Sequence, residues 1–271
     1  MSDRRVIAED EMRIGCISWS YRDEFADGTY DLSSWLKHCA EVARLDGVEI
    51  WNKHVESLDE KYLKDVSAEA RSRGLQVYSL ASKLSFGDFS DDHIARVEED
   101  LRIWLQAAHR VGAPILRFSI GGEDLRSSGR RSLIFDTIRN SLEQNERILQ
   151  GVRIGIENQE PGFIQSAEDV DEMVRVLGGK VGLILDNGSF LDRRTSYDFV
   201  RRTVDDALLF HAKFYDFADE TGDRVLDYGK MRDLLRASTY RGYLSIEMDS
   251  KASATAFVPR IAGYLRRLFG E

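Results

Sequence analysis

Short apolar runs recur along the chain, and the segment after each of them has helical spacing. The runs are rich in Val, Ile, Leu and Phe, and each is short enough for a single strand. They cover residues 13–18, 47–51, 75–81, 114–119, 152–158, 181–187, 208–214 and 243–249. The pattern therefore predicts eight strands that alternate with helices.

The segments between the runs carry apolar residues at the 3.6-residue period of a helix. After the third run these residues are Ile94, Val97, Leu101, Leu105 and Ala108, and near the chain end they are Phe257, Ile261, Tyr264, Leu265 and Leu268. Ser166 and Asp169 have the spacing of a capping box, which marks the start of a helix. Glycines at helix C-cap positions come one to three residues before a strand, at Gly47, Gly74, Gly112, Gly178, Gly179 and Gly242.

Eight strand–helix alternations fit few architectures. The chain has 271 residues, and a parallel barrel of eight strands and helices typically needs about 250. An open, doubly wound sheet is the competing fold, but no GxGxxG motif follows the first strand. We therefore predict the α/β class and a single-domain (β/α)8 TIM barrel over residues 13–271, preceded by a polar N-terminal tail over residues 1–12.

The alternation along the later strands predicts which side chains face the barrel axis. Neighbouring residues of a strand face opposite sides, so uncharged Ile154 and Ile156 pack outward and Glu157 points inward. The same alternation places Asp186, His211 and Glu247 on the inward faces of the next three strands, near their carboxyl ends. Because the carboxyl ends of barrel strands form the catalytic mouth, these four side chains should converge there.

Two earlier strands add charged residues to the inward set. Glu49 and Trp51 face the axis when Val48 and Ile50 pack outward, and Arg117 faces it in the fourth strand. Carboxylates that share one mouth repel each other by several kcal/mol unless cations compensate. Arg117 and Lys213 are candidate compensating groups, but a bound metal ion is the favoured explanation.

Composition narrows the classes of partner. The formal net charge of -9 and the pI near 5.2 argue against a nucleic-acid partner, which needs a basic face. The two cysteines, Cys16 and Cys39, are too few for a disulfide scaffold and are expected to be buried free thiols. The first residues lack the apolar region of a secretory signal, and no stretch is long enough to span a membrane. We therefore expect a cytoplasmic enzyme with no membrane partner.

Four segments carry a resemblance to a known family. IGIENQ, LILDNGSF, FHAKFYDF and LSIEMD resemble the xylose isomerase-like TIM-barrel superfamily, in its sugar phosphate isomerase/epimerase group, and are similar to tagatose/psicose 3-epimerases. The resemblance implies one divalent metal ion bound by Glu157, Asp186, His211 and Glu247. Oxygen-rich ligation with one imidazole favours Mn²⁺ or Mg²⁺ over Co²⁺ or Zn²⁺.

The resemblance also implies a reaction. It is a metal-dependent epimerisation or isomerisation of a sugar, keto-sugar or cyclitol through an enediolate, with Glu157 and Glu247 as the catalytic acid and base. The chain departs from the 3-epimerases at Ser189, where they usually have a histidine, and it lacks their arginine a few residues after the strand-seven histidine. The resemblance therefore does not extend to their sugar. Lys213 instead follows a His-x-Lys pattern of other branches.

Residues near the metal ligands and at the ends of the early strands are candidates for substrate binding. They are Lys213, Asn187, Arg117, Trp19, Trp51, His54 and Glu49. The tryptophans could stack on a sugar ring or pack in the core, and His54 could serve acid-base chemistry or lie on the surface. Lys213 could bind a substrate oxygen or an anionic group, or pair with Asp186 or Glu247.

Two other functions remain open. A lyase, such as an inosose-type dehydratase or a keto-glycoside-cleaving enzyme, would share the enolate chemistry and differ in the fate of the β-substituent. A non-catalytic carbohydrate-binding barrel would bind no metal. A trinuclear hydrolase similar to endonuclease IV needs many more histidines than the five present. The expected partner is a small-molecule carbohydrate, and the sequence leaves a homodimer open.

Overall fold

The structure, a computed structural model, describes residues 12–82, 84, 91–121, 123–126, 128–190 and 192–270. Within these ranges, only the backbone is described at residues 91–95, 123–124 and 128. The predicted polar tail over residues 1–12 lies outside the described residues except for Met12, which is buried.

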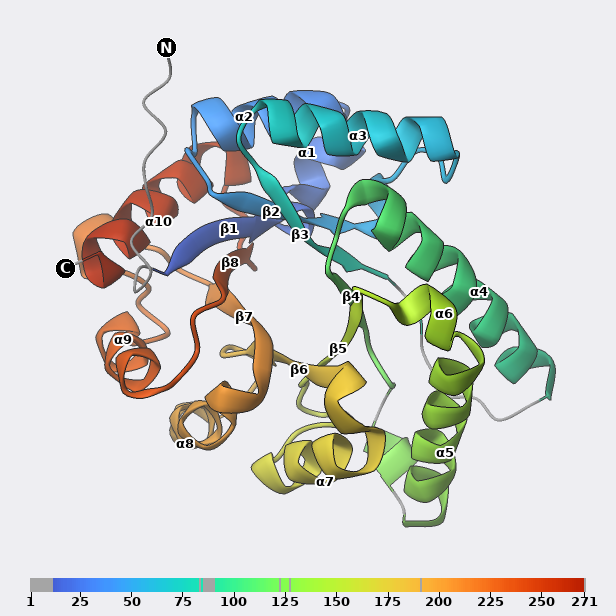
Figure 1. The fold of residues 1–271 in the computed structure, drawn as a ribbon. Helices are drawn as coiled ribbons and strands as arrows, with labels where there is room; N and C mark the ends of the chain where they lie inside the picture. The colour runs from blue at the N-terminus through green and yellow to red at the C-terminus, as the bar shows by residue number, and fades with distance from the viewer. Residues whose placement is uncertain are drawn as a thin grey trace.

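Eight parallel strands form a closed barrel in sequence order (Figure 1). They are β1 (Arg13–Ile17), β2 (Gly47–Trp51), β3 (Gln76–Ala81), β4 (Ile115–Phe118), β5 (Arg153–Glu157), β6 (Val181–Asp186), β7 (Ala207–Phe214) and β8 (Tyr243–Met248). Strand β8 pairs with β1 and completes the ring. Each strand ends within one residue of its predicted limits, and the prediction of a TIM barrel is confirmed.

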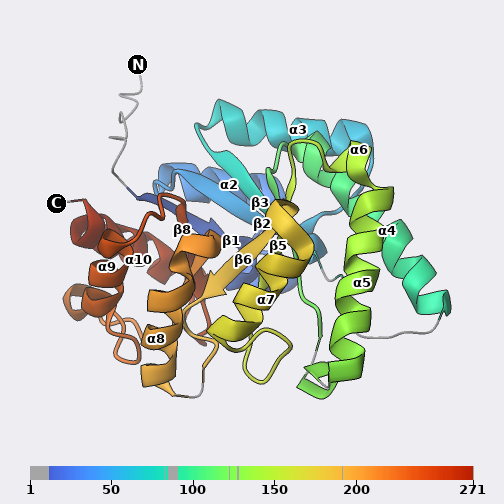
Figure 2. The same ribbon diagram turned by 60° about the horizontal axis from the view of Figure 1, so that its bottom comes forward.

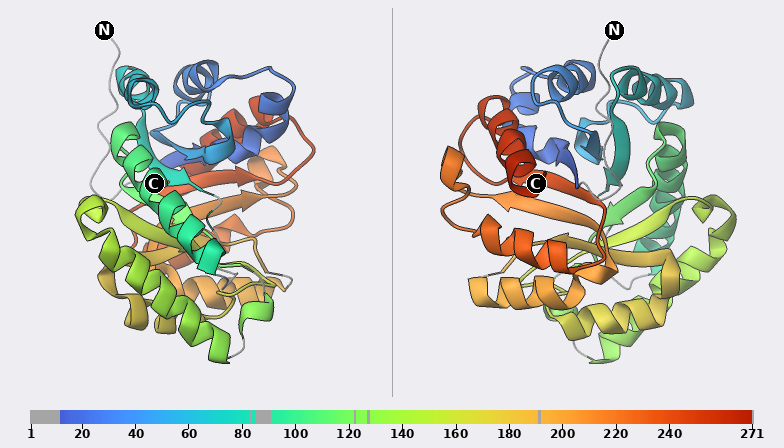
Figure 3. Two further views of the ribbon diagram at one scale, coloured as in Figure 1. Left: turned by 90° about the vertical axis from the view of Figure 1, so that its right-hand side faces the viewer. Right: turned by 60° about the vertical axis from the view of Figure 1, so that its left-hand side comes forward.

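Helices surround the strands as an outer ring in Figure 1, and Figures 2 and 3 show them from other sides. They are α1 (Arg22–Ala26), α2 (Leu32–Glu41), α3 (Glu60–Ser72), α4 (Asp91–Val111), α5 (Ser128–Gln144), α6 (Glu146–Leu149), α7 (Ala167–Leu177), α8 (Arg193–Thr203), α9 (Tyr228–Ala237) and α10 (Ala254–Phe269). Helix α10 packs on β1 and β8 and closes the ring. Among the described residues, no helix has the length and apolar character needed to cross a membrane.

The core has two parts, on either side of the barrel wall. The larger part lies between strands and helices and contains Ile154 and Ile156, as the alternation predicts. The smaller part fills the axis near the amino ends of the strands, with Tyr78, Ile115, Ile184, Leu209 and Tyr243. Because these inward side chains are apolar while those nearer the carboxyl ends are charged, the barrel separates a packed end from a polar end.

Strict alternation fails at two places in the barrel wall. The pairing of β2 with β3 skips Tyr78, and the pairing of β6 with β7 skips Leu208. An extra residue of this kind is a β-bulge, which re-aims the side chains around it. In β3 it brings consecutive Tyr78 and Ser79 to the barrel interior, because Tyr78 belongs to the axial core and Ser79 contacts Glu49.

Local signals at the helix ends are confirmed in most cases. The capping box of Ser166 and Asp169 is present at the start of α7. Gly74 and Gly112 each have φ of +80°, the left-handed conformation expected of a residue that ends a helix. The C-cap prediction is wrong at Gly242, because α9 ends at Ala237 and its C-cap is Ser238. It is also wrong at Gly47, which lies within β2, where a Cβ atom would come within 2.5 Å of the Gln76 carbonyl oxygen.

The two cysteines are buried free thiols, as predicted. Cys16 lies in β1 and Cys39 in α2, and neither is exposed to solvent. Burial in apolar surroundings raises the pKa of both thiols, which keeps them protonated and unreactive.

Candidate metal centre

Four side chains from consecutive strands meet at the carboxyl end of the barrel. Glu157 ends β5, Asp186 ends β6, His211 lies in β7 and Glu247 lies in β8. One nitrogen or carboxylate oxygen from each of the four lies within 4.8 Å of all the others. The inward alternation and the parallel register of the strands, which pairs Asp186 with His211, bring them together.

Three buried atoms in this cluster have no hydrogen-bond partner among the described residues: Glu157 Oε1, His211 Nδ1 and Glu247 Oε2. The His211 Nδ1 atom lies 2.9 Å from the Glu157 oxygen and 2.6 Å from the Glu247 oxygen, but neither contact has hydrogen-bond geometry. Unpaired buried polar atoms are costly, so their convergence indicates a missing partner. Two carboxylate oxygens and an imidazole nitrogen facing one point fit a divalent metal ion, for which Asp186 supplies a further oxygen.

Two basic side chains compensate the negative charge of the clustered carboxylates. Arg117 forms an ion pair with the second oxygen of Glu157. The Lys213 ammonium lies 2.8 Å from the second oxygen of Glu247 and 3.2 Å from an oxygen of Asp186. Each glutamate therefore turns one oxygen to a counter-charge and the other to the centre of the cluster.

These charges shift the pKa values of the three carboxyl groups in different directions. Burial would raise the pKa of each carboxyl group, but Arg117 lowers the pKa of Glu157, and Lys213 holds that of Glu247 well below its usual range. For Asp186, burial outweighs Lys213, and the pKa is raised. The two glutamates are therefore ionised at neutral pH and able to accept a proton.

A buried carboxylate fixes the orientation of His211. Glu49 Oε2 lies 2.9 Å from His211 Nε2, so an Nε2 proton donated to Glu49 leaves Nδ1 to face the cluster. Glu49 is 0% exposed and also accepts hydrogen bonds from Ser79 at 3.1 Å and Ser245 at 3.2 Å. This carboxylate–histidine pair is typical of metal sites, where it sets the tautomer of the ligand.

Replacing Glu49 by Gln should weaken metal binding about 10–100-fold, the usual cost of losing such an outer partner. The neutral amide no longer stabilises the Nε2–H donor, while the four ligands stay in place. Metal titration followed by calorimetry measures the effect. The control is Glu56→Gln, the same change at an exposed residue of the β2–α3 loop. Equal affinity of the two variants would contradict the positioning role.

The Asp186 carboxylate is held by the chain that follows β6. Its oxygens accept hydrogen bonds from the Gly188 backbone N–H and the Ser189 hydroxyl, each at 2.7 Å. Asn187 is 0% exposed, and its side-chain oxygen accepts a hydrogen bond from the Lys213 backbone N–H at 2.9 Å. Asn187 thus ties β6 to β7 behind the cluster, whereas the sequence suggested a substrate contact.

Two tryptophans lie near the cluster and are partly exposed. The Lys213 ammonium lies 5.4 Å from the centre of the Trp19 ring, and the Arg22 guanidinium stacks on the same ring at 4.0 Å. Trp51 ends β2, and the Lys53 ammonium lies 4.9 Å from its ring centre. Both rings keep some exposed surface at the carboxyl end of the barrel.

His54 is buried beside the Trp51 ring. Its ring stacks on Phe25 with a centroid distance of 3.7 Å, and its Nδ1 atom lies 2.9 Å from the Ser18 hydroxyl oxygen. That oxygen also accepts a hydrogen bond from the Trp51 backbone N–H, so the hydroxyl proton is free to be donated to Nδ1. The contacts favour a neutral imidazole that supports the chain beneath Trp51.

The protein should lose stability in mild acid because of His54. Burial and the nearby Lys53 lower the pKa of His54 to about 4, whereas the unfolded chain has an ordinary value of about 6.5. The unfolded state therefore binds the proton first. Stability is full above pH 6.5 and falls until about pH 4. With solvent screening, the loss between pH 6.5 and pH 5 should be about 1 kcal/mol.

Urea denaturation at several pH values tests this expectation. A His54→Gln variant, which can still hydrogen-bond to Ser18, should lose correspondingly less stability over the same pH range. Identical pH profiles for the two proteins would remove His54 as the cause.

The structure brings most of the sequence candidates together at the carboxyl end of the barrel, some in the cluster itself and others around it. Glu157, Asp186, His211 and Glu247 form the cluster, Arg117 and Lys213 pair with it, and Trp19 and Trp51 lie near it. Glu49 contacts His211 and Asn187 contacts the Lys213 backbone, whereas His54 supports Trp51. The alternation along the strands did not single out Ser79, because a bulge precedes its contact with Glu49. Ser245 could have been found, since it lies two residues before Glu247 on the same inward face.

Comparison with known proteins identifies the family. The family model described as xylose isomerase-like TIM barrel matches residues 37–267. The chain belongs to this family. No curated protein sequence matches it significantly.

Solved structures show the same fold at low identity. The 3-keto-D-glucoside 4-epimerase YcjR of E. coli is 18% identical over 94% of this chain and 99% of that chain, with a TM-score of 0.74. The probable 3-DHS dehydratase AsbF of Bacillus anthracis is 13% identical over 94% and 98%, with a TM-score of 0.76. The IOLI protein with a bound zinc atom is 15% identical over 96% and 98%, with a TM-score of 0.75. At these identities the likeness establishes the fold alone.

Proposed function

We propose that the protein is a divalent-metal-dependent epimerase or isomerase of a sugar, keto-sugar or cyclitol. The observation that carries the proposal is the convergence of unpartnered atoms from Glu157, His211 and Glu247 at the barrel mouth. A binding protein without metal would have no need to bury three carboxylates around one imidazole. The family, which includes epimerases of this fold, supports the same conclusion.

Glu157, Asp186, His211 and Glu247 would hold the ion. When bound there, a divalent ion supplies a Lewis acid that polarises a ketose carbonyl and stabilises the enediolate form of the substrate. The oxygen-rich donor set favours Mn²⁺ or Mg²⁺, with Co²⁺ or Zn²⁺ as alternatives. The zinc in the IOLI structure is a reason to test Zn²⁺ as well.

Glu157 and Glu247 carry the proton transfers in this proposal. Both are ionised, and each has one oxygen directed to the centre of the cluster while its other oxygen pairs with Arg117 or Lys213. One carboxylate takes the proton from the carbon next to the carbonyl, and the other returns a proton. Return to the opposite face of the same carbon gives an epimer, and return to the neighbouring carbon gives an isomer.

The substrate would lie between the cluster and the exposed aromatic rings. Trp19 and Trp51 can stack on the apolar face of a sugar, and Lys213 can donate a hydrogen bond to one of its oxygens. Arg117 is partly exposed beside Glu157 and can contact a second oxygen.

Lys213 also favours a second candidate, a lyase. Its ammonium lies between Asp186 and Glu247, where it could donate a proton to a departing β-oxygen of the same enolate. AsbF, described as a probable dehydratase, has the same fold, which supports this second candidate. Only the fate of the β-substituent separates the two reactions.

Metal analysis combined with a panel of keto-sugars and cyclitols in D₂O tests the proposal. Solvent deuterium should enter the carbon next to the carbonyl in the metal-loaded protein and stop after EDTA treatment. Exchange without elimination supports the epimerase or isomerase, while loss of water or an aglycone supports the lyase. Metal-loaded protein that catalyses neither exchange nor elimination on any member would overturn both.

A further inference from the structure

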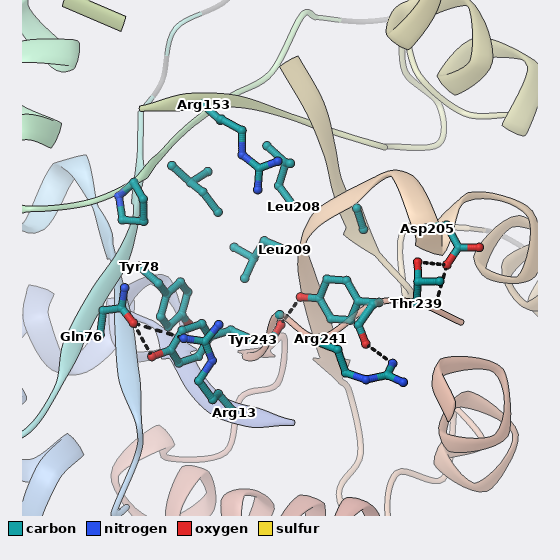
Figure 4. Close-up of a pocket in the computed structure, with 15 residues that line it drawn as sticks. Arg13, Gln76, Tyr78, Arg153, Asp205, Leu208, Leu209, Thr239, Arg241 and Tyr243 are labelled. Atoms are coloured by element: carbon teal, nitrogen blue, oxygen red, sulfur yellow. Dashed lines mark hydrogen bonds between the residues drawn. The ribbon is translucent and has the colours of Figure 1, made fainter. Parts of the chain in front are cut away.

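A cavity opens at the opposite end of the barrel from the metal cluster. It has a volume of about 360 Å³ and lies where several strands begin, lined by Arg13 at the start of β1, Arg153 at the start of β5 and Tyr243 at the start of β8 (Figure 4). The axial core separates it from the metal cluster, since Tyr78, Ile184 and Leu209 are at most 2% exposed. Packed side chains therefore separate the two sites.

The cavity is positively charged in an acidic protein. Three arginines line it, Arg13, Arg153 and Arg241, against a single carboxylate, that of Asp205. The chain as a whole has a formal net charge of -9. Asp205 accepts hydrogen bonds from the backbone N–H and the hydroxyl of Thr239, both at 2.8 Å, and none of the arginines reaches it as an ion pair.

The arginine head groups are positioned without carboxylate partners in the part of the chain that the structure describes. Arg13 donates to the Gln76 side chain at 3.4 Å and stacks on the Tyr243 ring at 4.3 Å. Arg241 donates to two backbone carbonyls, and Arg153 projects toward the middle of the cavity in Figure 4. Guanidinium groups held in this way present free donors suited to a planar carboxylate or a phosphate.

The inner wall of the cavity is aromatic and aliphatic. The rings of Tyr78 and Tyr243 stack with a centroid distance of 4.1 Å, and Ile115, Leu208 and Leu209 lie beside them. Such a wall favours an apolar or aromatic body on the ligand. The cavity is near the lower end of the usual range for ligand pockets, about 300–1,000 Å³, so it suits one ring with one anionic group.

We propose that this amino-end cavity binds a small organic anion, a carboxylate or phosphate carried on one aromatic ring. The ring would pack on the Tyr78–Tyr243 pair, and the anionic group would lie between Arg13 and Arg153. The site requires no metal and makes no use of the residues proposed for catalysis.

Calorimetric titration with phenyl phosphate and with benzoate tests the proposal. The protein is first treated with EDTA, so that a metal ion cannot bind the probe at the other end. At least one of the two probes should bind, and the stronger one shows which anion the site prefers. Arg13→Gln and Arg153→Gln should each weaken binding at least tenfold. Phenol and inorganic phosphate, which lack either the charge or the ring, should bind at least tenfold more weakly than the preferred probe.

The matched control is Arg147→Gln, the same change at an exposed arginine of α6 that does not line the cavity. It should bind the probe within twofold of the unmodified protein. Tyr78 is left in place because its hydroxyl donates to Ser245, which in turn bonds to Glu49. No binding of either probe would overturn the proposal. An equal loss of affinity in Arg13→Gln, Arg153→Gln and the control Arg147→Gln would also overturn it. Inorganic phosphate binding as tightly as the aromatic probe would overturn the ligand class.

Discussion

A protein with Asp186 replaced by Asn should fold normally, bind divalent metal more than about 100-fold more weakly and lose about 10³-fold or more in kcat/KM. Asp186 offers an oxygen to the cluster and has no part in the proposed proton transfers, so its loss isolates the metal-holding role. Losing an outer partner of a ligand already costs about 10–100-fold in affinity, and losing a ligand should cost more. Losing several kcal/mol of charge stabilisation corresponds to about a thousandfold in rate.

Folding of this variant should be retained because the amide keeps the shape of the side chain. Its oxygen can still accept the hydrogen bond from the Gly188 backbone N–H, and its NH2 group can donate to the Ser189 hydroxyl oxygen in place of the bond that Ser189 now donates. The pKa of Asp186 is raised by burial, which means that the folded, metal-free protein disfavours the charge there. Removing that charge leaves Lys213 paired with Glu247, so the metal-free variant should lose less stability than a variant without Lys213.

Thermal unfolding with and without Mn²⁺ separates these effects. The unmodified protein should gain stability as metal is added, since a ligand that binds only the folded state stabilises it, and the Asp186→Asn variant should gain little. The control is Asp192→Asn at the start of α8, where asparagine caps a helix as well as aspartate does. An Asp186→Asn protein that keeps its metal content and its turnover would rule out Asp186 as a ligand.

The inward alternation explains how far the metal cluster could be predicted from sequence. Glu157, Asp186, His211 and Glu247 each follow uncharged neighbours in strands buried on both sides, so one face of each strand had to carry the polar residue inward. The regular order of strands then fixed their common position. No long-range information was needed, because strands that follow one another in the sequence are neighbours in this closed barrel.

Residues that act through a neighbour could not be assigned in the same way. Glu49 was correctly predicted to face inward. Its contact with His211, however, crosses the barrel and joins residues that are 162 positions apart in the sequence. Ser79 reaches Glu49 only because a bulge shifts β3 by one residue, and no signal in the sequence marks that bulge. Arg13 and Arg153 were not singled out in the sequence, because a charged residue at the start of a strand is usually solvated.

Replacing Lys213 by Met should destabilise the metal-free protein by about 3–5 kcal/mol, the usual cost of leaving buried charges without their partner. Burial would lower the pKa of Lys213, but Asp186 and Glu247 raise it well above its ordinary value, so the side chain is a cation in the folded protein. Its ammonium pairs with both carboxylates, at 3.2 Å from Asp186 and 2.8 Å from Glu247. Without it, Asp186 loses its ion-pair partner and Glu247 keeps only the contact with His211 among the described residues, in a buried site.

Metal should rescue the Lys213→Met variant if Lys213 mainly balances charge. A divalent ion bound by the same carboxylates supplies the missing positive charge, so the melting temperatures of variant and unmodified protein should converge as Mn²⁺ is added. The control, Lys180→Met, removes an exposed lysine that pairs with Glu146 and should change little with or without metal.

The kinetics of the metal-loaded variant then decide what else Lys213 does. Because Lys213 lies 5.4 Å from the Trp19 ring at the partly exposed side of the cluster, it is also placed to hold a substrate oxygen. A substrate contact would raise KM at full metal occupancy, whereas proton donation to a leaving group would lower kcat for elimination and leave deuterium exchange intact. If stability is restored by metal and both kinetic constants are unchanged, Lys213 serves only to balance the charge of the empty ligand set.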